Sequence, residues 1–173
     1  QHQILNLLGM QQQERSMAMV LVTHDLGVVA GRTDEILVMY AGKIVEKAKT
    51  AEIFHTTEHP YTEALLRSIP KTDQPSHTRL AAIAGRPPTL IEITKGCSFS
   101  PRCPYAQERC FEEEPALEET SPDHYTACWY RVGTPENQEA WDKNLAAGRL
   151  STLAIDQGHI VDEVPVNVGS GGN

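Results

Sequence analysis

All four cysteines of the chain fall within 32 residues, and this cluster is the clearest sign of chemistry in the sequence. They are Cys97, Cys103, Cys110 and Cys128, separated by five, six and seventeen residues, and Pro104 directly follows the second. Structural zinc sites usually pair their thiolates through two to four intervening residues, whereas iron–sulfur ligand sets include wider gaps and a proline beside a cysteine. The spacing therefore favours an iron–sulfur cluster, and it leaves zinc, free thiols and disulfides as alternatives.

The residues around these cysteines include few large apolar side chains. Glycine, proline and charged residues dominate the segment, and its acidic runs, Glu112–Glu114 and Glu118–Glu119, are interpreted as a solvated face. Small folds with so little apolar material are usually held together by a metal or by disulfides. Because nothing at the start resembles a signal peptide, we expect a reducing compartment, which favours thiolates over disulfides.

Composition excludes some classes of function. The net charge of −8 argues against nucleic acid as the main partner, because a phosphate-binding face needs surplus lysine and arginine. The longest apolar run, Met17 to Val22, is far shorter than a membrane span. The sequence begins at Gln1, without a methionine and within a helical pattern, so we expect it to be the C-terminal part of a longer protein.

One histidine stands at a position where α/β proteins often bind ligands. The run 17–22 is short and continuously apolar, which predicts a strand buried on both faces of a parallel sheet. His24 follows that strand at its C-terminal edge, where open α/β sheets bind their ligands. Asp25 is the expected N-cap of a short helix over 26–31. From position alone, a packed or hydrogen-bonded structural histidine remains the alternative for His24.

The remaining patterns predict short elements on either side of the cysteine segment. Strands over 35–40 and 43–47 are joined by Ala41-Gly42, which predicts an antiparallel hairpin at the edge of the sheet. The other predicted elements are a helix over 3–8 ended by Gly9, a short helix capped by Thr50, a helix over 61–68 opened by Pro60, an amphipathic helix over 138–145, a weak strand over 160–168 and a flexible end over 169–173.

Four segments match a known family in both sequence and order. They are Leu21–Val29 (LVTHDLGVV), Val38–Glu46 (VMYAGKIVE), His59–Leu66 (HPYTEALL) and Cys97–Tyr105 (CSFSPRCPY). A strand followed by Thr-His-Asp is shared by ABC ATPases generally, whereas the His-Pro-Tyr-Thr segment and the proline-flanked cysteines resemble the peptide-importer branch. Over roughly residues 1–131, the chain resembles the C-terminal half of an ATP-binding subunit of an oligopeptide/dipeptide ABC transporter.

The resemblance implies a fold and a division of the chain. The implied fold class is α/β: the C-terminal portion of an ABC-type nucleotide-binding domain, followed by a small irregular cysteine-rich regulatory segment. Residues 1–69 are expected to form the end of the ATP-binding domain and 70–87 a linker. Residues 88–131 are expected to form the cysteine-rich C-terminal domain, and 132–173 a poorly defined tail.

The resemblance also implies roles for individual residues. His24 matches the family's switch histidine, which contacts the γ-phosphate of ATP, and phosphoryl transfer depends on such positioning and electrostatics. Cys97, Cys103, Cys110 and Cys128 match a motif that can hold a [4Fe–4S] cluster, with zinc as the alternative. The implied cofactors are therefore ATP and Mg²⁺ in the complete subunit, and the cluster in the cysteine segment.

The chain departs from the family pattern in one important respect. It contains no Gly-x-x-x-x-Gly-Lys-Ser/Thr loop, no Ser-Gly-Gly-Gln-type signature and no apolar strand ending in Asp-Glu. In the family these motifs lie upstream of the matched part. We therefore do not expect this chain alone to hydrolyse ATP.

The implied function is to energise peptide import as part of an ATP-binding subunit. The implied partners are a second ATP-binding subunit in a homo- or heterodimer, membrane permease subunits and, indirectly, a solute-binding protein. The implied location is the cytoplasmic face of a bacterial or archaeal inner membrane. The alternatives are an importer subunit for nickel or another small solute, and a stand-alone metal-binding regulatory module.

Overall fold

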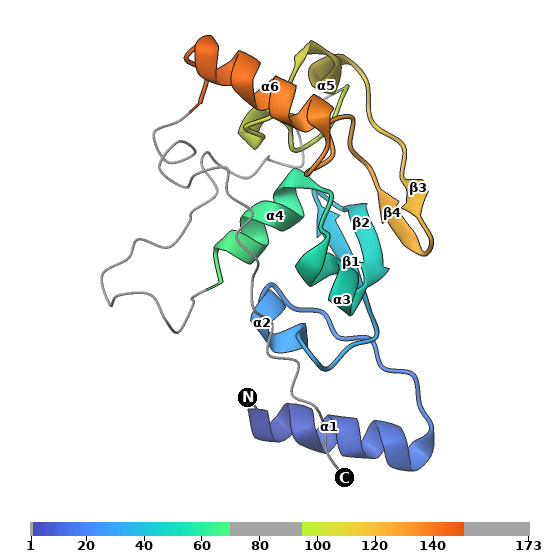
Figure 1. The fold of residues 1–173 in the computed structure, drawn as a ribbon. Helices are drawn as coiled ribbons and strands as arrows, with labels where there is room; N and C mark the ends of the chain where they lie inside the picture. The colour runs from blue at the N-terminus through green and yellow to red at the C-terminus, as the bar shows by residue number, and fades with distance from the viewer. Residues whose placement is uncertain (1, 70–94, 151–173) are drawn as a thin grey trace, which may run out of the picture.

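A computed structural model describes residues 2–69 and 95–150 of the chain (Figure 1). The predicted linker over 70–87, the weak strand over 160–168 and the end over 169–173 lie outside these residues. Figure 1 places α1 at one end of the molecule, α5 and α6 at the other, and the sheet between them. The elements in chain order are α1 (His2–Arg15), α2 (Leu26–Val29), β1 (Glu35–Tyr40), β2 (Lys43–Lys49), α3 (Thr50–His55), α4 (Pro60–Arg67), the 3₁₀ turn η1 (Ser100–Arg102), α5 (Glu108–Glu112), β3 (Glu118–Ser121), β4 (His124–Thr126) and α6 (Pro135–Ala146).

The predicted hairpin is confirmed and lies at the centre of the fold. β1 and β2 pair antiparallel from Glu35↔Lys49 to Tyr40↔Lys43. Ala41 and Gly42 both have positive φ angles, 48° and 81°, as a two-residue turn between twisted strands requires. The hairpin therefore follows from local turn chemistry.

The cysteine segment shares a sheet with this hairpin, which corrects the expectation that the segment is irregular. The sheet has four strands in the order β1-β2-β4-β3. β4 pairs antiparallel with β2 through Glu46↔Thr126 and Lys47↔Tyr125, and the Ala127 N–H donates to the Val45 carbonyl at 2.9 Å. Residues 95–131 also include η1 and α5. Periodicity could not reveal this pairing because β3 and β4 are only four and three residues long.

The larger of two apolar clusters joins the sheet, α3, α4 and the cysteine segment. Phe99 is almost fully buried, with its ring 5.2 Å from that of Tyr40 and 5.4 Å from that of Tyr61. The buried residues of this core are Val29, Ile36, Val38, Tyr40, Val45, Ala48, Ile53, Phe54, Leu66 and Phe99. A second, smaller cluster joins Tyr105 to Ala140 and Trp141 of α6. The cysteine segment thus packs between the sheet and α6.

The parallel strand predicted over 17–22 does not form. These residues have no strand structure, and Val20 and Val22 are 90% and 92% exposed. A strand buried on both faces needs paired neighbours and covering helices, and the sheet of the described residues does not include this run. The prediction from apolar content was therefore wrong for this structure.

Two predicted helix boundaries were also wrong, and two others are confirmed. α1 continues through Gly9 to Arg15, because one glycine inside a helix costs only about 1 kcal/mol. Thr50 begins α3 but does not cap it, since its hydroxyl donates to the Thr33 carbonyl at 2.6 Å. Asp25 does cap α2, accepting from the Gly27 N–H at 2.9 Å. Pro60 does open α4, as predicted.

The amphipathic pattern over 138–145 corresponds to α6, which begins earlier than expected. Thr134 is its N-cap and accepts from the Asn137 N–H at 3.3 Å, and Pro135 occupies the first turn. Asn144 of α6 donates to the carbonyls of Pro104 and Ala106 at 2.8 and 3.0 Å. Within residues 2–69 and 95–150, no helix is long and apolar enough to cross a membrane.

Candidate functional site

The four cysteines converge on one small cavity, although they come from different parts of the segment. Cys97 precedes η1, Cys103 follows it, Cys110 lies in α5, and Cys128 follows β4. The cavity has a volume of about 20 Å³, close to the space that one water molecule needs. Its lining residues are His59, Pro60, Cys97, Phe99, Ser100, Cys103, Tyr105, Cys110, Pro115, Cys128, Trp129 and Tyr130. The fold thus brings together the side chains that the sequence singled out.

Backbone contacts hold the two cysteine-bearing loops against each other. The Cys97 N–H donates to the Cys110 carbonyl at 2.8 Å. Gly96 makes this approach possible, because a Cβ atom at that position would lie only 2.3 Å from the same carbonyl oxygen. Within the first loop, the Ser100 N–H donates to the Cys97 carbonyl at 3.0 Å, and the Cys103 N–H donates to the Ser100 carbonyl at 3.3 Å.

Backbone N–H groups also point at the cysteine sulfurs. The Cys97 sulfur accepts from the N–H groups of Phe99 and Ser100. The Cys103 sulfur accepts from the Tyr105 N–H, and the Cys128 sulfur accepts from the Tyr130 N–H. Burial nevertheless raises the pKa of all four thiols, and negative charge on neighbouring cysteines raises the pKa of Cys97, Cys103 and Cys128 further. These raised pKa values favour the neutral thiol. A bound cation would favour the thiolate instead, since coordination to a metal deprotonates a thiol.

The cysteine thiols do not form a metal site as they stand. In the part of the chain that the structure describes, no group of three or more histidine, cysteine, aspartate or glutamate side chains is arranged to hold a metal ion. All four cysteines are free of disulfides. The structure therefore shows convergence of the cysteines without showing ligation.

His59 lines the cavity but has a structural role. Its Nδ1 accepts from the Tyr61 N–H at 3.1 Å, which caps α4, and its other nitrogen bonds to the Ala127 carbonyl. Burial lowers the pKa of this imidazole to about 3, against the opposing effect of the Ala127 carbonyl. Both ring nitrogens are committed to the protein, so the neutral ring ties α4 to the residues that follow β4.

An open groove borders the cavity and shares part of its wall. The groove has a volume of about 370 Å³ and lies between the β1–β2 turn, residues 97–99 and residues 114–117. Cys97, Phe99 and Pro115 line both spaces. Lys43 and Glu114 form an exposed ion pair at the groove. Of the four cysteines, Cys97 therefore lines both the cavity and the groove.

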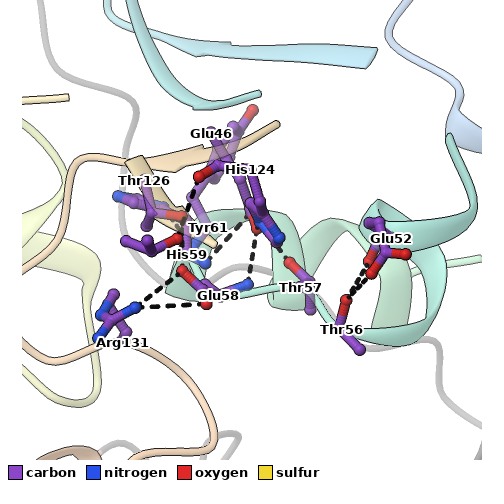
Figure 2. Close-up of polar contacts among 11 residues, drawn as sticks. Glu46, Glu52, Thr56, Thr57, Glu58, His59, Tyr61, His124, Thr126 and Arg131 are labelled. Atoms are coloured by element: carbon purple, nitrogen blue, oxygen red, sulfur yellow. Dashed lines mark hydrogen bonds and ion pairs between the residues drawn. The ribbon is translucent and has the colours of Figure 1, made fainter. Parts of the chain in front are cut away.

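Sequence reasoning missed a buried polar network beside the cavity, which Figure 2 shows. Glu46 of β2 is fully buried and accepts from the Thr57 hydroxyl at 3.0 Å, the Glu58 N–H at 2.6 Å and the His59 N–H at 3.1 Å. His124 of β4 bonds to the same carboxylate through Nε2 at 2.9 Å. Because a carboxylate oxygen only accepts, this nitrogen carries the proton. No periodic signal marks Glu46, since it is buried next to the buried Val45.

Glu58 extends the network towards the end of the cysteine segment. It accepts from the Thr126 hydroxyl at 3.0 Å and forms an ion pair with Arg131 at 3.3 Å (Figure 2). Burial raises the pKa of Glu58, but bonds from Thr120 and Thr126 and the charges of Arg131 and His124 outweigh it and lower the pKa below its usual value. The loop before α4 is thereby joined to β4 and the residues that follow.

His24 lies away from the cysteines. It is exposed in the segment directly before α2, while α5, which carries Cys110, is at the other end of the molecule in Figure 1. The Asp25 N–H donates to the Thr23 hydroxyl at 3.1 Å, so the backbone on both sides of His24 is held by local bonds. The predicted site residues thus lie in two separate parts of the structure, with His24 before α2 and the cysteines in the segment that carries α5.

Comparison with known proteins agrees with the resemblance. The chain is 46% identical over 130 residues to the dipeptide transport ATP-binding protein DppD of Escherichia coli (strain K12), covering 75% of this chain and 39% of that protein. It is 43% identical over 132 residues to the oligopeptide transport ATP-binding protein OppD of Salmonella typhimurium, covering 76% and 39%. A third relative, OppD of Mycobacterium tuberculosis, is 42% identical over 74% of this chain and 21% of its own length. The chain therefore spans about two fifths, or less, of the relatives that it matches.

The family match falls on the part of the chain that forms the site. Residues 45–110 match the family described as the C-terminal region of oligopeptide/dipeptide transporters. This range begins in β2, includes α3, α4 and η1, and ends in α5 at Cys110. It thus contains Glu46, His59 and three of the four cysteines. The chain thus matches the C-terminal region of oligopeptide/dipeptide transporters over residues 45–110, and its relatives are dipeptide and oligopeptide transport ATP-binding proteins.

Proposed function

We propose that the chain is part of an ATP-binding subunit that energises the import of peptides through an ABC transporter. The observation that carries this proposal is an identity of 41–46% to dipeptide and oligopeptide transport ATP-binding proteins over about three quarters of the chain. In this proposal the complete subunit binds ATP and Mg²⁺ and pairs with a second ATP-binding subunit. The pair acts on membrane permeases at the cytoplasmic face of the membrane, supplied by a solute-binding protein.

Within that subunit, His24 is proposed to contact the γ-phosphate. His24 is exposed, so its imidazole can contact a nucleotide bound by another part of the complete subunit. Local hydrogen bonds of Thr23 and Asp25 hold the backbone on either side of it. Both features support this role. Such a contact assists the chemical step by positioning and electrostatics. The residues that would bind the rest of the nucleotide are not among the motifs of this chain.

The transport proposal is tested by uptake into cells of the source organism. Deletion of the gene should abolish uptake of a labelled tripeptide and leave Ni²⁺ uptake intact, and the wild-type gene should restore it. A gene carrying His24→Ala should fail to restore uptake, whereas His55→Ala, which changes an exposed histidine of α3, should succeed. Loss of Ni²⁺ uptake instead would favour the nickel importer, and no loss of either would favour a stand-alone module.

We also propose that Cys97, Cys103, Cys110 and Cys128 hold one metal centre that fastens the segment to the sheet. Three observations support a thiolate-bound centre: four cysteines line one cavity, backbone N–H groups point at the sulfur of each, and apolar and aromatic side chains make up most of the remaining wall. Such a centre supplies folding free energy, because its ligands converge only in the folded chain. We assign it a structural or oxygen-sensing role.

The identity of this centre is a choice between a [4Fe–4S] cluster and zinc. The wide cysteine spacing supports the cluster. The cavity volume of about 20 Å³ supports a single ion, since a cluster would require the loops around Cys97 and Cys110 to move apart. Anaerobic purification followed by iron, sulfide and zinc analysis decides between them. Iron and sulfide in equal amounts, lost in Cys103→Ser, would establish the cluster, and one zinc per chain without sulfide would establish zinc.

A further inference from the structure

His24 is the middle residue of a turn that a side chain closes. The Asp25 N–H donates to Thr23 Oγ1 at 3.1 Å, so the two bonded groups belong to the residues directly before and after the histidine. Turns of this kind mimic a backbone turn and restrict the conformation of the residue inside them. The direction in which the imidazole leaves the backbone is therefore coupled to the Thr23 hydroxyl.

The chain after His24 is anchored to the body of the fold. Asp25 Oδ1 accepts from the Gly27 N–H at 2.9 Å and caps α2. Within α2, Leu26 packs against the larger apolar cluster, and Val29 is buried as part of it. The helix thus gives the turn around His24 a fixed base.

The chain before His24 depends on fewer contacts. Val22 is 92% exposed, whereas Leu21 packs partly against the same apolar cluster. Within residues 2–69 and 95–150, the bond between Asp25 and Thr23 is the hydrogen bond that joins this side of His24 to the anchored helix. Removal of the Thr23 hydroxyl would therefore free the backbone on one side of the histidine and leave the other side fixed.

We propose that Thr23 is a positioning residue that fixes the direction of the His24 imidazole by accepting the hydrogen bond from the Asp25 N–H. The inference rests on the proposed contact between His24 and the γ-phosphate. A group that assists phosphoryl transfer must be held in place, because that chemistry depends on positioning and electrostatics. A displacement of about 1 Å can lower a rate about 100-fold. Loss of the Thr23 hydroxyl should thus slow the reaction although Thr23 does not itself touch the nucleotide.

The experiment uses the complete ATP-binding subunit, expressed from its full-length gene and assembled with its partner subunits. Thr23→Val removes the hydroxyl and keeps the branched shape, whereas Thr23→Ser keeps a hydroxyl that can accept the same bond. Thr56→Val is the matched control, since Thr56 is also exposed and its hydroxyl bonds locally to Glu52. The kcat and KM of Mg-ATP hydrolysis are measured for each variant, together with its unfolding midpoint.

Thr23→Val should lower kcat by about 5–100-fold. The lower value corresponds to the loss of one ordinary hydrogen bond, and the upper value to a displacement of the imidazole by about 1 Å. The KM and the unfolding midpoint should stay unchanged, because the lost interaction acts in the transition state rather than in substrate binding. Thr23→Ser should keep most of the activity, and Thr56→Val should match the wild type.

A wild-type kcat in Thr23→Val would overturn the inference, as would an equal loss in Thr23→Ser or in Thr56→Val. A loss that appears as a raised KM or a lowered unfolding midpoint would also overturn it, since Thr23 would then support nucleotide binding or folding in general. His24→Ala in the same assay separates this failure from that of the proposed function. Loss of turnover in His24→Ala with normal turnover in Thr23→Val removes the role of Thr23 alone. Normal turnover in His24→Ala removes the proposed role of His24 and this inference with it.

Discussion

His124 bonds to Glu46 across 2.9 Å, and both side chains are almost completely buried. The two residues lie 78 positions apart in the chain. Glu46 belongs to β2 of the central hairpin, and His124 begins β4, which leads to Cys128. This contact therefore joins the sheet directly to the strand that carries the last cysteine into the cavity.

Glu46→Gln should destabilise the chain by about 1–3 kcal/mol, the usual cost of leaving a buried hydrogen-bonding group without its partner. Gln presents an amide NH₂ to a site at which four donors converge, so at least one buried donor loses its acceptor. Chemical denaturation of the metal-free chain measures the change. The matched control, Glu52→Gln, alters an exposed residue of α3 and should stay within about 0.5 kcal/mol of the wild type. Equal stability of the two variants would show that the network does not hold the fold.

Glu58 should make the stability of the chain depend on acidic pH. Its pKa is lowered in the folded chain, so the folded state binds its proton less readily than the unfolded state does. The resulting stabilisation is complete above the ordinary glutamate pKa of 4.5 and is lost as pH falls through the lower, folded value. Denaturation midpoints from pH 6 down to about pH 3 should therefore fall less steeply in Glu58→Gln than in wild type. Identical slopes would contradict the assignment, and Glu136→Gln, an exposed change in α6, is the control.

Gly96→Ala should destabilise the chain by about 1–3 kcal/mol, as overpacking usually does. The added methyl group would lie 2.3 Å from the Cys110 carbonyl oxygen and 2.7 Å from the carbonyl carbon of Phe111. Both are backbone atoms, so the two cysteine-bearing loops would have to separate. Gly9→Ala provides the opposite control: it meets no atom within 4 Å and should stabilise helix α1 by about 0.5–1 kcal/mol. Thermal unfolding of both variants checks the pair, and a neutral Gly96→Ala would contradict the close packing.

Cys97 should be alkylated faster than Cys103 in the folded, metal-free chain. Cys97 lines both the cavity and the open groove, whereas Cys103 lines the cavity but not the groove. Timed treatment with iodoacetamide, followed by peptide mass spectrometry, gives the two rates. Lys43→Ala removes the ion pair with Glu114 at the groove and should increase the rate at Cys97 alone. Equal rates at the two cysteines would mean that the groove does not lead to the site.

The chain by itself should show no measurable affinity for Mg-ATP. A phosphate-binding loop supplies most of the nucleotide's contacts through backbone N–H groups and a lysine, and the sequence contains no such loop. Isothermal titration at protein concentrations near 100 μM, within the range of common enzyme KM values, tests this. A clear micromolar isotherm would contradict the prediction.

The sequence by itself determined the elements that depend on interactions between residues close together in the chain. The β1–β2 hairpin follows from a two-residue turn whose positions accept positive φ, and α4 follows from Pro60 in its first turn. The Asp25 cap is likewise a bond between residues two positions apart. The importance of the cysteines was also evident from sequence, because their clustering is visible without any structure.

Only the tertiary structure decided the features that depend on distant partners. The run 17–22 has strand character, but a strand exists only when another strand pairs with it, and no strand among residues 2–69 and 95–150 does so. Thr50 has the chemistry of a cap, yet it bonds to Thr33 instead. The pairing of β2 with β4 joins Glu46 to Thr126, which lie 80 positions apart, so no local sequence pattern could predict it. That long-range pairing buries Glu46 against His124 and brings Cys128 to the other three cysteines, because it places the end of the segment beside its beginning.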